Sequence, residues 1–204
     1  MTADQQFWDD RYAAEGYLFG EEPSQFVTRR FVDIAPGGRV LAVADGEGRN
    51  GVFLAGKGFD VLSVDASPVA VAKALDLASR RGVILQAQVV DLEDWVWPEA
   101  AFDAVVAVFI QFAPPDLRAR LFAGMKAAVR PGGRILLHGY RPEQLAYGTG
   151  GPRAAANLYT ADGLAAAFSD WRILTLDSYD AELREGAGHA GMSALIDLVA
   201  ERPA

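Results

Sequence analysis

The segment VLAVADGEGRN (40–50) constrains the fold of this chain more than any other. A continuous apolar run (39–43) predicts a buried strand, and it leads into Gly46 and Gly48 and then into an expected helix (50–57). Glycine allows the sharp turn and lets a ligand touch the backbone. In an open parallel sheet this first turn lies at the carboxyl edge, where ligands bind.

The rest of the chain alternates short apolar runs with helical stretches, which is typical of an α/β fold. We expect strands at 39–43, 61–64, 83–90, 102–109, 134–138, 173–179 and 193–200, and helices at 5–15, 23–34, 50–57, 67–81, 115–129 and 161–168. No helix separates the last two strands, so we expect them to pair antiparallel at one end of the sheet. The prediction is one domain (1–204): a doubly wound, seven-stranded, mostly parallel sheet with helices on both faces and an N-terminal helical cover.

Two acidic positions follow the next strands. The second strand ends at Asp65, whose carboxylate can accept hydrogen bonds from ribose hydroxyls. The third leads to Asp91 and Leu92, where an adenine would lie. These two positions fit a nucleoside site. The glycine segment also matches the pattern G-x-G-x-x-G at Gly46, Gly48 and Gly51, so a dinucleotide site is an alternative, and a glycine turn that binds no ligand is another.

At this point the chain resembles class I S-adenosylmethionine-dependent methyltransferases. The matching pieces are in family order and cover roughly residues 36 to 140: GEGRN, VDASP with Asp65, VVDLED, FDAVVAV and RPGG. GEGRN followed by VFLA resembles the tellurite-resistance-type branch. FWDDRY (7–12) and FGEEPS (19–24) resemble that branch's N-terminal helix and loop, which usually close over the cofactor.

The resemblance implies S-adenosylmethionine as cofactor. The positions it implies for cofactor binding are Trp8, Tyr12, Ala44, Asp45, Gly46, Gly48, Asn50, Asp65, Ala66, Asp91, Leu92 and Val108. Family members usually carry an acid at the position of Ala42 and a glycine at that of Ala44. The missing acid normally helps to hold the cofactor's amino group. Asp45 is a candidate substitute; without one, binding would be weaker.

Catalysis by such an enzyme depends mainly on placing the acceptor in line with the methyl group and excluding water. A base is needed only for a protonated oxygen or nitrogen acceptor. Gln111 follows the fourth strand, and His138 and Tyr140 follow the fifth, so these three are the candidate catalytic residues. Gln111 could instead cap the next helix, and His138 could be a hydrogen-bonded edge residue. His189, in a glycine-rich hairpin, is expected at the rim of the site.

Charge and composition limit the partners. The net charge is −8 with only 19 Lys and Arg residues, which disfavours a nucleic-acid substrate and leaves a small-molecule methyl acceptor. No apolar run is long enough for a membrane helix, and the N-terminus lacks a secretory pattern, so we expect a cytoplasmic protein that does not bind membranes. With no cysteine and two distant histidines, no metal is expected. The oligomeric state stays open.

Two other functions compete with a methyltransferase. An NAD-dependent oxidoreductase could use the same glycine turn, but 204 residues leave no separate substrate domain, and Asp91-Leu92 and the RPGG turn disfavour it. A non-catalytic nucleoside-binding module is kept open by Ala42 and Ala44.

Overall fold

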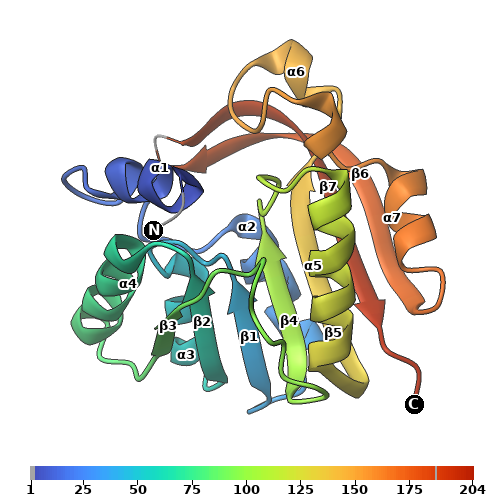
Figure 1. Cartoon of the computed structure of the whole chain (residues 1–204), viewed down its shortest axis with the longest axis horizontal. Helices are drawn as coiled ribbons and strands as arrows, with labels where there is room; N and C mark the ends of the chain where they lie inside the picture. The colour runs from blue at the N-terminus through green and yellow to red at the C-terminus, as the bar shows by residue number, and fades with distance from the viewer. Residues whose placement is uncertain (1–2, 187) are drawn as a thin grey trace.

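A computed structural model describes residues 3–186 and 188–204 of the chain (Figure 1). Seven strands form one sheet in the order β3-β2-β1-β4-β5-β7-β6. The strands are β1 (Arg39–Val43), β2 (Asp60–Asp65), β3 (Gln86–Val89), β4 (Phe102–Val108), β5 (Val129–Tyr140), β6 (Arg172–Glu185) and β7 (His189–Glu201). The order confirms the expected doubly wound sheet, which turns back between β1 and β4.

The last two strands form the antiparallel end of the sheet. β1 to β5 pair in parallel, whereas β7 pairs antiparallel with both β5 and β6. This confirms the pairing expected from the missing helix between them. In Figure 1 the β6–β7 hairpin extends past the rest of the sheet toward α1 (Ala3–Tyr12), and the backbone N–H of Gly188 donates to the carbonyl of Leu18 at 3.3 Å.

Helices cover both faces of the sheet. α5 (Pro115–Ala128) and α7 (Ala161–Ala167) pack on one face, and α2 (Gln25–Arg30), α3 (Arg49–Gly56) and α4 (Pro68–Arg80) pack on the other. The apolar strands β1 and β4 lie between the two layers and are buried along almost their whole length, as a central parallel strand requires. The apolar side chains between the sheet and each helix layer form two cores, and these hold the carboxyl edge of the sheet in place.

Local sequence signals explain several helix starts. Ser67 caps α4, since its hydroxyl accepts the backbone N–H of Ala70 at 3.1 Å, and Pro68 occupies the first helical position. Thr160 caps α7 in the same way, accepting the N–H of Gly163 at 3.1 Å. The capped start expected at Ser67 is confirmed.

The ends of several helices and strands differ from those expected, because contacts between distant segments determine where these elements begin and end. β3 is shorter than predicted, while β6 and β7 are much longer because each supplies the other's backbone hydrogen bonds. The helix expected at 23–34 is split into α2 and the 3₁₀ turn Phe31–Asp33. Two short elements were not anticipated, α6 (Gln144–Tyr147) and a 3₁₀ turn at Ala155–Asn157.

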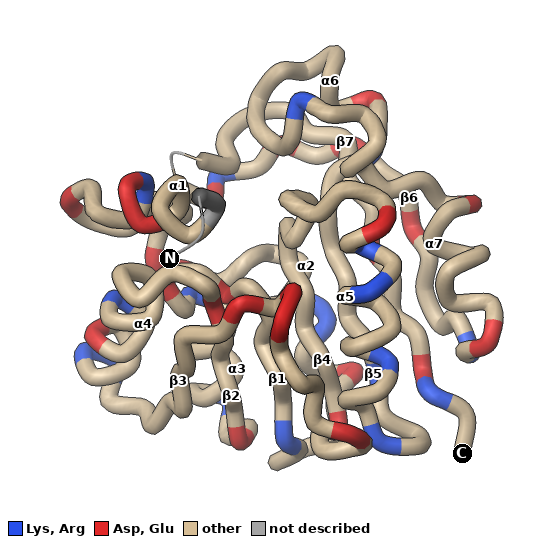
Figure 2. Tube along the Cα trace, viewed as in Figure 1, with Lys and Arg blue, Asp and Glu red and all other residues tan. Residues whose placement is uncertain are grey.

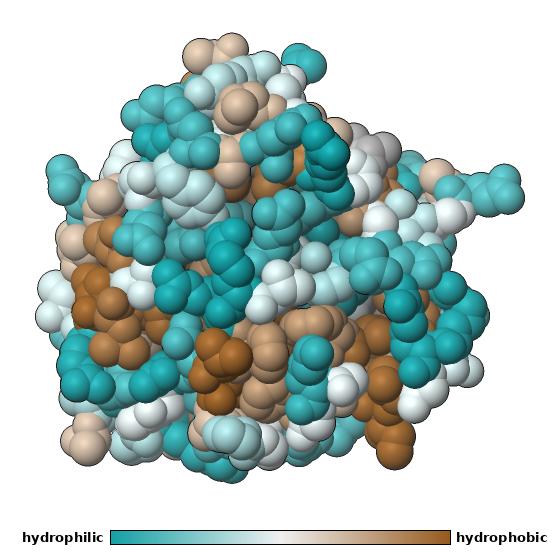
Figure 3. All heavy atoms as spheres, turned by 180° about the vertical axis from the view of Figure 1, so that it is seen from behind, coloured by the Kyte–Doolittle hydropathy of each residue, from teal (hydrophilic) through white to brown (hydrophobic). Residues whose placement is uncertain are grey.

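The surface is chemically mixed. Lys and Arg are spread along the chain rather than gathered on one face (Figure 2). On the face seen in Figure 3, apolar areas are interrupted by polar ones. Among the helices within residues 3–186 and 188–204, none is both long and apolar enough to cross a membrane.

Candidate functional site: a cavity at the carboxyl edge of the sheet

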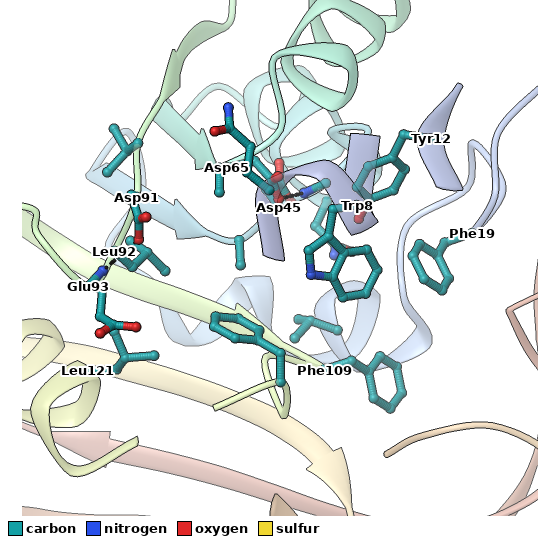
Figure 4. Close-up of a pocket in the computed structure, with 18 of the residues that line it drawn as sticks. Trp8, Tyr12, Phe19, Asp45, Asp65, Asp91, Leu92, Glu93, Phe109 and Leu121 are labelled. Carbon is teal, nitrogen blue, oxygen red and sulfur yellow. Dashed lines mark hydrogen bonds between the residues drawn. The ribbon is translucent and has the colours of Figure 1, made fainter. Parts of the chain in front are cut away.

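A cavity of about 210 Å³ lies where β1, β2 and β4 end, beneath α1 (Figure 4). Its lining combines side chains from the strand ends, from α1 and the following loop, from α5 and from the start of β7. The lining residues are Gln5, Trp8, Tyr12, Phe19, Ala44, Asp45, Gly46, Arg49, Asn50, Asp65, Ala66, Val90, Asp91, Leu92, Glu93, Val108, Phe109, Phe112, Pro114, Leu117, Leu121 and His189.

Gly46 shapes the turn after β1. Its φ is +58°, and a Cβ there would lie 2.8 Å from the Tyr12 hydroxyl, so only glycine leaves room beneath α1. The backbone N–H of Gly46 donates to Asp65 at 2.8 Å. The turn is therefore tied directly to the end of β2.

Asp65 is buried and organises two backbone segments at once. One carboxylate oxygen accepts the Gly46 N–H and the other accepts the N–H of Ser67 at 2.9 Å. Burial outweighs these hydrogen bonds and raises the pKa of Asp65 to about 6. Each carboxylate oxygen has a further lone pair, so Asp65 can still accept ribose hydroxyls.

Asp45 has hydrogen-bond partners within the fold. Its carboxylate accepts the Ser63 hydroxyl at 2.9 Å and the Gly51 N–H at 3.1 Å, and burial raises its pKa to about 7. A Cβ on Gly51 would collide with this carboxylate, which explains the third glycine of the motif without any dinucleotide. Asp45 lines the cavity with its carboxylate engaged by the fold, and its role as a substitute for the missing acid stays a prediction.

Arg49 is a cavity residue that the sequence reasoning missed, although it belongs to the GEGRN motif. It is buried, and its Nη2 forms an ion pair with Glu185 at 2.8 Å. Its Nη1 is buried with no hydrogen-bond partner in the described part of the chain. An unpaired buried guanidinium donor is costly and therefore indicates a missing acceptor.

Aromatic side chains of the N-terminal segment close the cavity on one side. Trp8 and Tyr12 stack with their ring centroids 5.6 Å apart, and Tyr12 contacts Phe19 edge-on. The Ser67 hydroxyl donates to Asp9 and so attaches α1 to the start of α4. The expected cover thus lies over the turn, and Trp8 and Tyr12 line the cavity.

Eleven of the twelve positions proposed for the cofactor lie in the cavity lining, and Gly48 is the one that does not. Gly48 has a φ of +82°, and a Cβ there would collide with Ala74 of α4. Its role is close helix packing at the start of α3. Whether the other eleven touch the cofactor stays a prediction.

The three candidate catalytic side chains are not among the residues that line the cavity, and their catalytic roles stay predictions. The Gln111 amide clamps β4 to β5 by accepting the Tyr140 N–H at 2.6 Å and donating to the Tyr140 carbonyl at 2.8 Å. His138 is buried, with Nδ1 2.6 Å from the Asp197 carboxylate and its ring stacked on Phe26. Internal partners thus occupy these groups, and neither Gln111, His138 nor Tyr140 is among the lining residues.

His189 reaches the cavity, as expected of the hairpin. Its ring stacks on Phe109 at 4.1 Å and contacts Phe19 at 4.6 Å, and its Nδ1 lies 2.5 Å from the Tyr140 hydroxyl. Phe109 follows β4 with a φ of +58°, a left-handed conformation rarely adopted by a bulky residue. Phe19 belongs to the N-terminal segment expected to close over the cofactor, whereas Phe109 was not singled out, since an isolated phenylalanine carries no sequence signal for a site.

Comparison with known proteins identifies the central part of the chain. Residues 40–133 match the family model described as a methyltransferase domain. This part of the chain is a class I S-adenosylmethionine-dependent methyltransferase domain. The cofactor of the domain is therefore S-adenosylmethionine, which replaces the dinucleotide alternative.

Curated relatives of the methyltransferase domain are moderately similar. Hemagglutinin 1 of Eikenella corrodens is 36% identical over 105 residues, 48% of this chain and 33% of that protein. Glycine/sarcosine N-methyltransferase of Halorhodospira halochloris is 29% identical over 175 residues, 78% of this chain and 61% of that protein. The chain thus spans between a third and three fifths of the length of these two relatives.

Solved structures share the fold. One was determined in work on the conversion of a disulfide bond into a thioacetal group during echinomycin biosynthesis; its TM-score is 0.80 at 22% identity, covering 98% of this chain and 91% of that chain. TehB from Haemophilus influenzae has a TM-score of 0.71 at 17% identity, covering 97% of this chain and 66% of that one. At these identities the likeness shows the methyltransferase fold, and it singles out no branch.

Proposed function

We propose that this chain transfers the methyl group of S-adenosylmethionine to a small-molecule acceptor. The observation that carries the proposal is the order of groups along the cavity: the Gly46 turn, Asp65 and Asp91 follow one another at the carboxyl edge of a methyltransferase sheet. A tellurite-resistance-type branch and a cytoplasmic location stay predictions.

The lining fits the cofactor by its chemistry. Asp65 would accept the ribose hydroxyls, and the apolar side chains of Ala66, Leu92 and Val108 would flank the adenine. The unpaired Nη1 of Arg49 would bind the carboxylate of the methionyl part, which supplies the missing acceptor. The buried Gly46 turn leaves the backbone accessible to a ligand only because it carries no side chain.

The cofactor supplies an already activated methyl group, so the protein's task is binding, orientation and exclusion of water. Trp8 and Tyr12 of α1 would cover the reacting atoms on the side away from the sheet. Asp45 and Asp65 have their carboxylates engaged by the protein, so neither is placed as a general base.

A small acceptor fits better than a macromolecule. The cavity is roofed by α1, and four of the five charged lining residues are acidic: Asp45, Asp65, Asp91 and Glu93, against Arg49. An acidic, covered site opposes polyanions such as nucleic acids. The relative named glycine/sarcosine N-methyltransferase is named for small-molecule acceptors, which agrees with this choice.

Binding of matched nucleoside ligands to the protein tests the proposal. S-adenosylhomocysteine should raise the melting temperature and NAD should not. The double variant Arg49→Gln/Glu185→Gln keeps the buried pair neutral. It should bind S-adenosylhomocysteine roughly tenfold to a hundredfold more weakly, as expected for a lost hydrogen bond to a charged group. It should bind 5′-methylthioadenosine, which lacks the carboxylate, as the wild type does. A shift with NAD alone would overturn the proposed function.

A further inference from the structure

The cavity has a second end that the cofactor positions do not use. Phe19, Phe109 and His189 form this aromatic end, with Trp8 and Tyr12 beside it. In Figure 4, Phe19 lies on the far side of Trp8 and Tyr12 from Asp91, Leu92 and Glu93, where the adenine is expected. The aromatic end is therefore free to hold a second molecule.

Tyr140 fixes the protonation pattern of the His189 ring. The Tyr140 hydroxyl is buried, and its one hydrogen bond within the described chain is to His189 Nδ1. A buried phenol must donate its proton or leave it unsatisfied, so Tyr140 donates and Nδ1 accepts. Burial raises the pKa of Tyr140 well above its ordinary value, which keeps this proton on the phenol. The neutral imidazole then carries its own proton on Nε2.

Within the described residues, the His189 ring has one hydrogen bond, at Nδ1, and its Nε2–H is not among the fully enclosed unpaired atoms, so it is open to a ligand. The ring faces contact Phe19 and Phe109, and Nδ1 is used by Tyr140, so Nε2 is the remaining polar atom of a ring that lines the cavity. Phe109 holds its ring against His189 from a left-handed backbone position, and such strained positions concentrate at ligand sites. The cavity thus contains a directed, unpaired donor.

The His189 ring is a neutral hydrogen-bond donor rather than a cation. Burial and the nearby positive charges of Arg49 and Arg11 lower the pKa of His189 to about 3, so the ring is a neutral donor at physiological pH. A neutral N–H donor can bind an oxygen lone pair but not an ammonium group, and hydrogen bonds to an ionised oxygen such as that of a carboxylate are the stronger ones. Glu185 forms an ion pair with Arg49, so the charges beside the ring largely offset each other and the hydrogen bond of the Nε2–H selects the ligand.

We propose that the aromatic end is the acceptor subsite and that His189, held by Tyr140, donates its Nε2–H to a carboxylate oxygen of the acceptor. The acceptor class is a small molecule with a flat apolar part, which the rings of Phe19 and Phe109 contact, and a carboxylate beside its nucleophilic atom. This inference rests on the proposed methyl transfer, since it names that reaction's substrate. His189 touches the acceptor, and Tyr140 is a positioning residue.

Nitrogen-15 NMR of the histidine rings tests the tautomer directly, without any acceptor. The chain has only two histidines, and a His138→Gln variant assigns their signals. We expect His189 to be protonated on Nε2 and not on Nδ1, and Tyr140→Phe to release this preference. Protonation on Nδ1 in the wild type would overturn the proposal, whether or not S-adenosylhomocysteine binds.

Binding of two matched probes tests the acceptor class. With S-adenosylhomocysteine bound, benzoate should shift the His189 Nε2 signal, and benzylamine, which presents an ammonium on a similar ring, should not. His189→Phe keeps a flat ring and should weaken benzoate binding by roughly tenfold or more while leaving S-adenosylhomocysteine affinity unchanged. Equal binding of benzoate to wild type and His189→Phe, or preferred binding of benzylamine, would overturn the acceptor assignment. If the wild type did not bind S-adenosylhomocysteine, that result would instead contradict the proposed function.

Discussion

Arg49 and Glu185 form a buried ion pair, with Nη2 2.8 Å from Oε2, between the first residue of α3 and the last residue of β6. Glu185 also accepts the backbone N–H of Gln25 at 3.0 Å. The pair therefore joins the turn that would hold the cofactor to the hairpin that carries His189. The Arg49–Glu185 ion pair therefore supports both the proposed cofactor end and the proposed acceptor end of the cavity.

Removing one partner of this pair should destabilise the protein strongly. Arg49→Gln leaves the Glu185 carboxylate buried without its cation, and we expect a loss of about 3–5 kcal/mol in the free energy of unfolding. Urea denaturation measures it. Arg49→Gln/Glu185→Gln should recover most of the loss because no buried charge remains. A single variant as stable as the wild type would show that the pair is solvated rather than buried.

Ala44→Gly should stabilise the protein. Ala44 has a φ of +46°, which glycine adopts without steric cost, and we expect a gain on the order of 1 kcal/mol in unfolding free energy. Ala42→Gly is the matched control, because Ala42 is buried in the extended strand β1, where glycine should destabilise. If both variants lose stability equally, the turn does not hold Ala44 in a strained conformation.

The affinity for S-adenosylhomocysteine should rise with pH up to about 6 and then level off. Ribose hydroxyls donate to the ionised form of Asp65, whose pKa burial raises to about 6. Below that pH the carboxylate must first lose a proton, which costs about tenfold in affinity for each pH unit. Titration calorimetry from about pH 5 to about pH 8, a range that spans the pKa of Asp65, checks this. Asp65→Asn should bind weakly and lose the dependence; an unchanged slope in that variant would assign the titration to another group.

Hydrogen exchange should separate α1 from the loop behind it. Lys73 donates to the carbonyls of Ala14 and Gly16 at 2.8 and 2.6 Å, and Glu47 accepts the Leu18 N–H at 2.7 Å, so residues 13–24 are tied to the scaffold. S-adenosylhomocysteine should increase protection in α1 and leave residues 13–24 nearly unchanged, since closing elements come from the less stable parts of a fold. Equal changes in both segments would make the whole N-terminal segment one mobile unit.

The sequence indicated which residues meet at the proposed cofactor side of the cavity, because each part has a short-range cause. Gly46 is required by a local backbone conformation, and Asp65 and Asp91 follow apolar runs that the sheet brings to one edge. Parallel strands guarantee that such ends meet. The doubly wound, mostly parallel sheet and its antiparallel end could likewise be predicted before any contact was known, whereas the order of the strands comes from the structure.

The acceptor side was less predictable because long-range contacts decide it. Nothing near Gln111 or His138 in the sequence shows that Tyr140 and Asp197 occupy their polar groups. Phe19 and Phe109 meet His189 only because three distant segments converge. Their side chains alone do not distinguish a cavity wall from ordinary core packing.

The β6–β7 hairpin has a consequence for how the chain could change its substrate. The residues matched by the methyltransferase family (40–133) contain the Gly46 turn, Asp65 and Asp91, whereas Trp8, Phe19 and His189 lie outside them. The N-terminal segment and the β6–β7 hairpin can therefore change in sequence without altering the residues proposed to bind the cofactor. On the proposed assignment, a new sequence at the start of β7 would select a different acceptor, while the cofactor positions within 40–133 stayed the same.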